Sequence, residues 1–365
     1  MLIGIDASRA NRPEKTGVER YGYELIKQFA TLDRVNQYRL YMMDNARDDL
    51  RTLPPNFEPV VLPVRRFWTH TSLAKELRRN PVDRLFVPSH QVPWRHPKHT
   101  TVTIHDLGFQ DYRENYSRYH YLNLSIGTKY SAKWASQVIV PSEAVAADVS
   151  RTYDLPLSKL KVIPHGYDRT AYRDLTPERV AGVMQEYGVS DPYLIFVGRL
   201  EQRKNVSRVI EAFYRLRDSG LFGGQLVLVG NPGIGYDQIR GLIAKRDADY
   251  VVQTGFVTDQ HRAALLAGSR GLVFPSLHEG FGIPILEAFA AGTPVITSQY
   301  GAPVEVAGDA ALLVDPKRVS EIHQAMEHLL SSPATARKLA SAGLLRAKQF
   351  SWKKSAQITL EVLTA

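Results

Sequence analysis

The chain alternates short hydrophobic runs with longer stretches in which apolar residues recur every three or four positions. Short apolar runs bounded by turn-forming residues predict buried strands, and the helical spacing predicts amphipathic helices. Regular alternation of the two is typical of a doubly wound α/β fold with a parallel sheet. The alternation occurs twice, with predicted strands at residues 2–6, 38–43, 60–64, 84–87, 101–105, 137–140 and 160–163, and then at 193–197, 225–229, 250–253, 271–274, 294–297 and 311–314.

The double alternation predicts two domains. A chain of 365 residues is longer than a single hydrophobic core usually supports. Residues 166–190 lack a strong strand pattern and contain Thr176-Pro177-Glu178, a good helix start. We therefore predict one Rossmann-like domain at residues 1–170 and a second at 171–350. Two such domains facing each other would leave a cleft between their strand ends, and ligand pockets favour domain interfaces.

A glycine-punctuated turn with two carboxylates follows one strand of the second half. Residues 278–292 read HEGFGIPILEAFAAG and place Glu279 beside the turn and Glu287 one to two helical turns further on. The turn lies at the carboxyl end of a strand, where open α/β sheets bind ligands, and the helix N-terminus after Gly282 favours an anion. The pattern predicts a site for an elongated phosphorylated sugar. Alternatively, Glu287 is solvated and Glu279 only complements the helix dipole.

A second strand end in the same half is basic. Residues 196–206 read FVGRLEQRKNV, with three cations within six residues before a helix. Arg199 can bind a diphosphate through a bidentate fork and Lys204 as a point charge. One basic site and one acidic, glycine-rich site together match a nucleotide diphosphate attached to a sugar.

Both segments resemble the signature regions of the retaining GT-B glycosyltransferases of family 4, and the resemblance spans nearly the whole chain. It implies two Rossmann-like domains facing across a cleft, with a last helix, about residues 351–365, that returns to the acceptor-side first domain. It also implies that Arg199 and Lys204 bind the donor diphosphate, that Glu279 lies near the reacting sugar, and that Glu287 holds the ribose hydroxyls. The donor-binding segment then includes Gly280, Phe281, Gly282 and Ile283.

The first domain carries two further candidate positions at strand ends. Gly17 opens a helix after a polar loop, where family members keep a glycine-containing loop near the donor phosphates, often with two adjacent glycines; here the pair is Thr16-Gly17. An ordinary strand-to-helix turn is the alternative. The family also has a histidine near the donor sugar at the position of His105, with Asp106 as an acceptor-side candidate. A structural histidine and a local turn cap are the alternatives for these two.

The composition of the chain indicates which partners it binds and in which cellular compartment it lies. Residues 1–165 hold 24 Lys plus Arg against 17 Asp plus Glu, so they carry +7 of the net charge of +9. A basic surface suggests an anionic partner, and without a nucleic-acid-binding motif we expect a phosphorylated acceptor or an anionic membrane, not nucleic acid. The chain has no cysteine, no signal peptide and no apolar run of transmembrane length. We expect a cytoplasmic protein.

The segment from residue 65 to 79 mixes cations with aromatic and aliphatic residues, as interfacial helices do. Residues 112–121 form another basic, tyrosine-rich stretch. If the acceptor is lipid-linked, such a surface would bring the protein to the inner face of the cell membrane. The alternative is that Leu73 and Leu77 pack on the sheet while the charges are solvated.

The sequence thus predicts a retaining glycosyltransferase that moves a hexose from a nucleotide diphosphate sugar to a glycan or lipid-linked hydroxyl. We expect no cofactor or metal, because cations and helix N-termini can stabilise the leaving diphosphate. GDP-mannose is the expected donor, since residues 17–21, 104–106 and 201–205 resemble bacterial mannosyltransferases of polysaccharide assembly. A UDP-sugar transferase for glucose or N-acetylglucosamine, and a non-catalytic sugar-nucleotide-binding subunit, are the alternatives.

Overall fold

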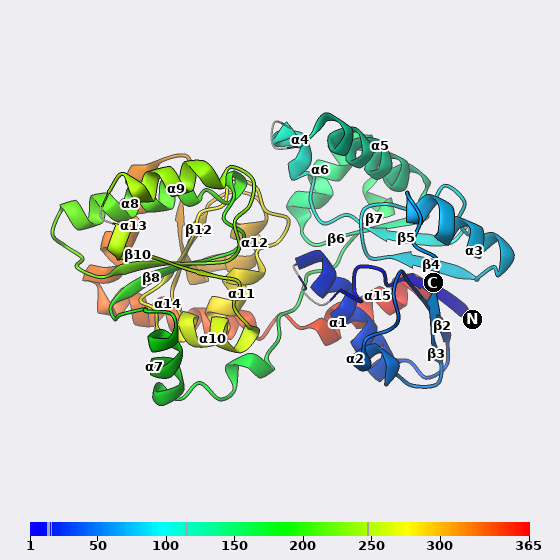
Figure 1. The fold of residues 1–365 in the computed structure, drawn as a ribbon, viewed down its shortest axis with the longest axis horizontal. Coiled ribbons are helices and arrows are strands. Elements are labelled where there is room, and N and C mark those ends of the chain that lie inside the picture. Colours follow the sequence, from blue (N-terminus) through cyan, green and yellow to red (C-terminus); the bar gives the residue numbers. More distant parts are fainter. Residues whose placement is uncertain (13–14, 16, 114–115, 247) are drawn as a thin grey trace. The chain divides into compact units, whose positions relative to one another are not determined.

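The computed structural model describes residues 1–12, 15, 17–113, 116–246 and 248–365. It divides into two compact units, Met1–Gly166 together with Ser351–Ala365, and Tyr167–Phe350. Each unit is a parallel sheet with helices on both faces (Figure 1). The predicted α/β class, with two Rossmann-like doubly wound domains, is confirmed.

The sheet of the first unit has seven strands in the order β3-β2-β1-β4-β5-β6-β7, all parallel. Its strands are β1 (Leu2–Asp6), β2 (Gln37–Met42), β3 (Phe57–Val61), β4 (Arg84–Val87), β5 (Thr100–Thr103), β6 (Gln137–Val140) and β7 (Leu160–Val162). Its helices are α1 (Gly17–Leu32), α2 (Asp48–Arg51), the π-helix η1 (Thr69–Leu73), α3 (Ala74–Arg79), α4 (Gly108–Asp111), α5 (Arg118–Trp134), α6 (Glu143–Tyr153), the 3-10 turn η3 (Leu157–Lys159) and α15 (Trp352–Thr364).

The sheet of the second unit has six parallel strands in the order β10-β9-β8-β11-β12-β13. Its strands are β8 (Tyr193–Val197), β9 (Gln225–Val229), β10 (Val251–Gly255), β11 (Leu272–Phe274), β12 (Val295–Ser298) and β13 (Ala311–Val314). Its helices are η4 (Thr170–Tyr172), α7 (Pro177–Glu186), η5 (Gln202–Lys204), α8 (Val206–Asp218), α9 (Tyr236–Ala244), η6 (Ala248–Tyr250), α10 (Asp259–Gly268), α11 (Ile283–Ala290), α12 (Ala302–Ala307), η7 (Gly308–Ala310), α13 (Val319–Ser331) and α14 (Pro333–Ala347).

The apolar pattern sets these elements. All five residues of β8 are buried, as expected for a central parallel strand covered on both faces. Helix α8 buries Val206, Val209, Ile210 and Phe213, which recur with helical spacing. Helix α7 begins after Thr176, whose side chain accepts a hydrogen bond from the N–H of Arg179, so the predicted helix start is confirmed.

Two boundaries differ from the predicted ones by more than two residues. The third strand covers residues 57–61, not 60–64, because it pairs with β2 from Tyr38↔Phe57 to Met42↔Val61 and Pro63 follows soon after. The second unit begins at Tyr167, whereas the sequence analysis began it at residue 171. The ring of Tyr167 is buried in the core of the second unit, which places residues 167–170 there.

Candidate functional site

The strand order of the second unit brings the two predicted donor motifs together. The order in which successive strands are added to the sheet reverses between β8 and β11, which are parallel, hydrogen-bonded neighbours. Open α/β sheets bind ligands at such a switch point, at the carboxyl ends of the strands. The basic loop follows β8 and the acidic, glycine-rich loop follows β11. The two motifs, some seventy residues apart in sequence, therefore lie at one edge of one sheet.

Asn205 ties the two loops to each other. It adopts a left-handed conformation with φ of 65° at the start of α8 and is almost completely buried. Its side-chain amide donates to Pro275 O at 2.9 Å and to Pro316 O at 2.6 Å. The N–H of Leu277 in turn donates to Arg203 O at 2.9 Å. These bonds fix the β8 loop against the β11 loop, a role that the sequence analysis did not assign to Asn205.

Lys204 and Glu279 meet at this edge as an ion pair. Both side chains are largely buried, with 10% and 14% of their surface exposed. Buried charges are usually paired, because an isolated one is costly to remove from water. The structure thus brings together two residues that the sequence analysis assigned to different parts of the ligand, the diphosphate and the sugar.

Arg199, in the same loop after β8, is exposed. Its aliphatic stem lies against the loop after β9, where a Cβ on Gly233 would come within 2.7 Å of Arg199 Cγ. A Cβ on Gly230 would come within 2.1 Å of Gly198 O, so these two loops approach each other through glycine. The aliphatic stem of Arg199 is therefore closely packed, while the residue as a whole is exposed.

The glycine-rich turn forms as predicted. Gly282 is the N-cap of α11 with φ of 105°, a conformation that glycine adopts without steric cost, and Pro284 lies in the first turn. Gly280 is buried and Ile283 is half-buried. The side chain of Phe281 is also buried and packs on Phe350 with ring centroids 5.9 Å apart. The side chain of Phe281 thus belongs to the core, so the predicted contact with the donor would have to come from its main chain.

Glu287 is buried in α11, with 5% of its surface exposed. Its carboxylate oxygen Oε1 accepts a hydrogen bond from Arg262 Nη2 at 2.7 Å. The solvated alternative for Glu287 is therefore wrong. Arg262 lies on the neighbouring helix α10, and the sequence analysis missed it because nothing in the local sequence links residues 25 positions apart.

Gly17 is the first residue of α1 in the first unit, and a Cβ added there would meet no atom within 4 Å. Its backbone is not in the left-handed region, so no steric constraint of the fold requires glycine here. Thr16, the other member of the predicted pair, lies outside the described residues. In the first turn of the helix, buried Glu19 accepts a hydrogen bond from Arg9 Nη1 at 3.2 Å.

His105 follows β5 and is buried, with 7% of its surface exposed. Its Nε2 lies 2.9 Å from Pro88 O, and its Nδ1 lies 3.4 Å from His165 Nε2. The ring of Tyr21 packs on both imidazoles, and Trp352 packs on His165. The next residue, Asp106, accepts a hydrogen bond from the N–H of Gly108 at 2.9 Å, so it forms the turn cap named as its alternative role.

Burial lowers the pKa of the histidines in this cluster. The pKa of His105 is lowered by desolvation, and that of His165 is held well below its usual value by desolvation and by the neighbouring His105. Desolvation also lowers the pKa of His90, whose ring lies 5.7 Å from that of His105, to about 4. The cluster is therefore neutral at physiological pH.

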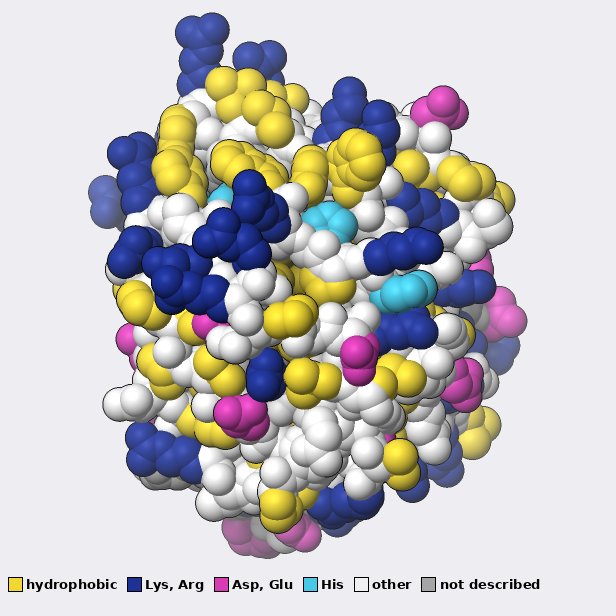
Figure 2. Space-filling model, turned by 90° about the vertical axis from the view of Figure 1, so that its right-hand side faces the viewer, with side chains coloured by type: hydrophobic (Ala, Val, Ile, Leu, Met, Phe, Trp, Pro, Cys, Tyr) yellow, Lys and Arg dark blue, Asp and Glu magenta, His cyan; other side chains and the backbone are white. Residues whose placement is uncertain are grey.

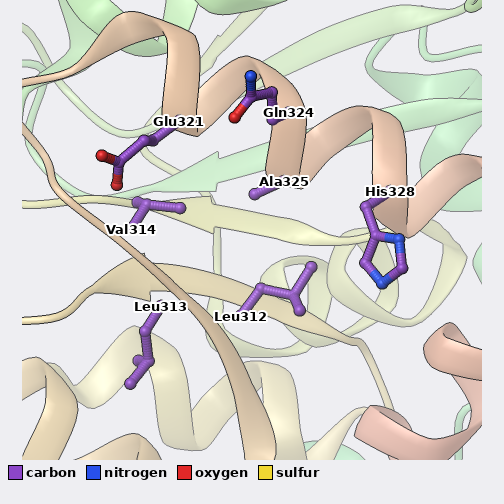
Figure 3. Close-up of a pocket in the computed structure, with 7 residues that line it drawn as sticks. All are labelled: Leu312, Leu313, Val314, Glu321, Gln324, Ala325 and His328. Carbon is purple, nitrogen blue, oxygen red and sulfur yellow. The ribbon is translucent and has the colours of Figure 1, made fainter.

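A shallow pocket of about 260 Å³ lies elsewhere in the second unit, between β13 and α13. Its polar side chains and Ala325 come from α13, and its other apolar side chains come from β13 (Figure 3). The Glu321 carboxylate there already accepts the N–H of Asp315 at 2.8 Å. No candidate donor residue lines this pocket. Within the described part of the chain, no group of three His, Cys, Asp or Glu side chains is placed to hold a metal ion.

Comparisons with known proteins agree with this geometry. Residues 15–171 match the family described as Glycosyltransferase Family 4, and residues 185–346 match Glycosyl transferases group 1. The O-antigen chain mannosyltransferase B of Escherichia coli is 27% identical over 94% of this chain and 95% of that protein. The MMP alpha-(1->4)-mannosyltransferase of Mycolicibacterium hassiacum is 31% identical over 64% of this chain and 55% of that protein.

Solved structures share the fold. WaaG, a glycosyltransferase involved in lipopolysaccharide biosynthesis, superposes with a TM-score of 0.77 at 20% identity and covers 100% of both chains. Anabaena Alr3699/HepE, solved in complex with UDP and glucose, gives a TM-score of 0.76 at 19% identity over 100% of this chain and 99% of that one.

Two Rossmann-like units, one with a basic and a carboxylate-bearing loop at its switch point, define a glycosyltransferase of the GT-B fold. The chain belongs to family 4 of these enzymes and resembles its mannosyltransferases in sequence. The family resemblance drawn from the sequence is thereby confirmed.

Proposed function

We propose that this glycosyltransferase moves mannose from GDP-mannose to a hydroxyl of a glycan or lipid-linked acceptor, with retention of configuration. The observation that carries the proposal is the single edge at β8 and β11, where Arg199, Lys204, Glu279 and the N-terminus of α11 converge. The choice of mannose is supported by similarity to O-antigen chain mannosyltransferase B and to the Escherichia coli mannosyltransferase WbdA, 27% identical over 76% of this chain but only 34% of that longer protein.

The diphosphate would bind to Arg199, Lys204 and the backbone N–H groups that open α11. Arg can grip phosphate oxygens bidentately, and a helix N-terminus favours negative charge. In the absence of ligand, Lys204 is paired with Glu279. A diphosphate would replace that carboxylate as the partner of Lys204 and free Glu279 for the donor sugar. These cations stabilise the leaving diphosphate without a metal or other cofactor, as in other electrostatically stabilised transition states.

The remaining candidate residues have assigned roles on this proposal. Glu287 holds the ribose hydroxyls, and the carboxylate of Glu279 stabilises the positive charge that develops on the sugar. In the first unit, Gly17 and His105 serve the donor phosphates and sugar. Asp106 remains an acceptor-side candidate only through its main chain and its turn, because its side chain caps Gly108.

A UDP-sugar is the second candidate donor. It is favoured by one specific observation: Alr3699/HepE, which shares the fold, was solved with UDP-glucose as well as with UDP and glucose. Diphosphate, ribose and hexose are common to both donors, so the residues named above serve either.

We further propose that the protein acts at the cytoplasmic face of an anionic membrane. No helix in the described part of the chain is long and apolar enough to cross a membrane. Side chains on the first unit instead form what we call the basic apolar surface. Its exposed apolar residues are Val64, Phe67, Trp94, Tyr119, Leu122, Ile126 and Trp134.

Cations surround these residues. Segments 61–75, 88–99 and 118–134 contain eight Lys or Arg residues and no Asp or Glu. Trp94 links the segments, because its ring stacks on His70 with centroids 4.4 Å apart and its carbonyl accepts from Tyr130 of α5 at 3.0 Å. Figure 2 shows the side of the molecule that lies at the right in Figure 1. Basic and apolar side chains intermingle on its upper part, where α3 and α5 lie. A surface of this composition fits anionic headgroups and the acyl boundary.

The surface differs from the one expected of residues 65–79 alone. Leu73 and Leu77 are buried, as is Trp68, so these three side chains pack on the core, and for the two leucines this is what the alternative interpretation stated. The exposed apolar positions shift to Val64, Phe67 and, above all, to α5.

A calorimetric screen tests the donor proposal. GDP-mannose, GDP, UDP-glucose and UDP-N-acetylglucosamine are titrated into the wild type with EDTA and with Mg²⁺. We expect preferential, metal-independent binding of GDP-mannose. Replacing Arg199 by Ala or Glu287 by Ala should weaken it by about 10- to 100-fold, the usual worth of a hydrogen bond to a charged group. Arg270→Ala is the control, because Arg270 pairs with Asp191 on the surface. Binding of UDP-sugars alone would overturn the donor, and binding of no nucleotide would overturn the proposal.

A further inference from the structure

Glu287 and Arg262 form a buried ion pair that the local sequence does not predict. Arg262 is the fourth residue of α10 and Glu287 the fifth of α11. Their side chains are 15% and 7% exposed. Arg262 Nη2 lies 2.7 Å from Glu287 Oε1 and also 2.7 Å from Asp259 Oδ1. One guanidinium nitrogen is thus held between two carboxylates from two helices.

This arrangement leaves one end of the Glu287 carboxylate available. Oε1 is held by Arg262, whereas Oε2 receives no hydrogen bond from any residue that the structure describes. Oε2 is not among the fully buried side-chain atoms that lack a hydrogen-bond partner, so it is accessible to solvent or to a ligand. A ligand hydroxyl at this position can donate a hydrogen bond to it.

We propose that Arg262 is a positioning residue that orients Glu287, so that Oε2 accepts hydrogen bonds from the ribose hydroxyls of the nucleotide. The inference rests on the proposed function, which places a nucleotide at this edge. Glu287 has freely rotating side-chain bonds, and an arginine fixed at 2.7 Å restricts them. Asp259, in the first turn of α10, fixes the arginine in turn. Arg262 acts through Glu287 and does not itself touch the ligand.

The ordinary alternative is a purely structural ion pair that joins α10 to α11. It predicts that loss of Arg262 lowers stability and weakens every ligand to the same extent. A positioning role predicts a selective effect, because only ligands with ribose hydroxyls use Oε2. The two roles therefore differ in the ratio of two binding constants, whatever happens to stability.

The experiment compares GDP with 2′,3′-dideoxy-GDP by calorimetry. In the wild type, loss of the hydroxyls should weaken binding by about 10- to 100-fold, as for hydrogen bonds to a charged acceptor. In Arg262→Leu this ratio should fall toward one, mainly through weaker binding of GDP. Arg262→Lys keeps a cation near Glu287 and should restore part of the ratio. Thermal unfolding identifies any variant that fails to fold. If Arg262→Leu does not fold, Arg262→Lys alone tests the inference. Lysine lacks the planar fork of arginine, so this variant should also show a smaller ratio of the two dissociation constants than the wild type.

Arg270→Leu is the matched control. Arg270 follows α10 and pairs with Asp191 at 2.8 Å, but both side chains are 53% exposed. In Arg270→Leu, the ratio of GDP binding to dideoxy-GDP binding should equal that of the wild type. Unchanged ratios in the Arg262 variants, with wild-type hydroxyl discrimination intact, would overturn this inference and leave the proposed function standing. A wild type that binds GDP without discriminating the dideoxy nucleotide also overturns it, and one that binds neither GDP nor UDP overturns both.

Discussion

At the residue scale, the buried histidines of the first unit have defined protonation. His105 Nε2 faces a carbonyl oxygen, so it must carry the proton and donate. Its Nδ1 then accepts from His165 Nε2, which fixes the tautomer of the second ring as well. Charged groups near His105 are Asp106, Arg9 and Glu19, and burial outweighs them in lowering its pKa. Both ring nitrogens of His105 are thus engaged within the first unit, as expected of the structural histidine named as its alternative role.

The same burial predicts a pH-dependent stability of the first unit. The folded pKa values lie below the unfolded value of about 6.5, so the stabilising contribution is complete above pH 6.5 and is lost as the pH falls towards the folded values, about 4 for His90. Between pH 7.5 and 5.5, His90 should remove about 1.4 kcal/mol from the free energy of unfolding, because its folded pKa of about 4 lies below this range, and His105 and His165 should add to the loss.

Urea denaturation followed by tryptophan fluorescence measures this effect, because Trp68, Trp94, Trp134 and Trp352 all lie in the first unit. The variant His165→Gln should lose the part of the pH dependence that His165 contributes. His120→Gln changes an exposed residue of α5 and should behave as the wild type. Equal pH dependence in wild type and His165→Gln would contradict the interpretation.

Residue-scale pairings are also what sequence reasoning could not supply. The positions of Glu279, Glu287, Arg199 and Lys204 followed from motifs, because each motif is contiguous. The ion pair of Lys204 with Glu279 joins residues 75 positions apart, and that of Arg262 with Glu287 joins residues 25 apart. Such contacts depend on how strands are ordered in the sheet, which a local pattern does not contain.

At the element scale, the strand predictions held where both faces of a strand are buried. The central strands β1, β4 and β8 coincide with their predicted ranges, since a continuous apolar run marks both ends. The edge strand β3 was displaced by three residues because its pattern is largely exposed and its limits are set by pairing with β2. The short helices around the loops depend on tertiary contacts and carry no period of their own.

Helix α5 shows a second element-scale feature, an apolar stripe that faces solvent. Leu122, Ile126, Tyr130 and Trp134 are four residues apart and so lie on one face of the helix. Leu122, Ile126 and Trp134 are 48%, 64% and 57% exposed. Lys129 and Lys133 flank the stripe and are exposed.

The membrane proposal predicts vesicle binding through this stripe. In flotation assays the protein should bind vesicles that contain anionic phosphatidylglycerol, bind neutral phosphatidylcholine vesicles weakly, and dissociate at high salt. Replacing Leu122 and Ile126 by Asp should lower the binding constant at least about tenfold, because it removes apolar burial and adds repulsion. Leu345→Asp is the control, since Leu345 is 65% exposed on α14 of the second unit. Equal binding of all three proteins would contradict the assignment.

At the scale of the whole molecule, one design occurs twice. Each sheet reverses its strand order next to its first strand, at β1 and β4 in one unit and at β8 and β11 in the other. In both, the candidate residues follow strands near that point: Gly17 after β1, His105 after β5, Arg199 after β8 and Glu279 after β11. The α/β class could be predicted from the sequence, and the candidate sites could be proposed, because parallel sheets place function at strand ends.

The central claim is that these strand ends transfer mannose, and a transfer assay tests it most directly. GDP-mannose labelled with ¹³C at C1 is incubated with octyl mannosides in EDTA, and the product is read by NMR. The account predicts release of GDP and a new α-linked mannoside, reduced about a hundredfold or more in Arg199→Ala. A β-linked product would contradict retention, and transfer from UDP-glucose with none from GDP-mannose would contradict the donor. Folded wild type that binds the donor but transfers no sugar from GDP-mannose or UDP-glucose would contradict the claim for these acceptors.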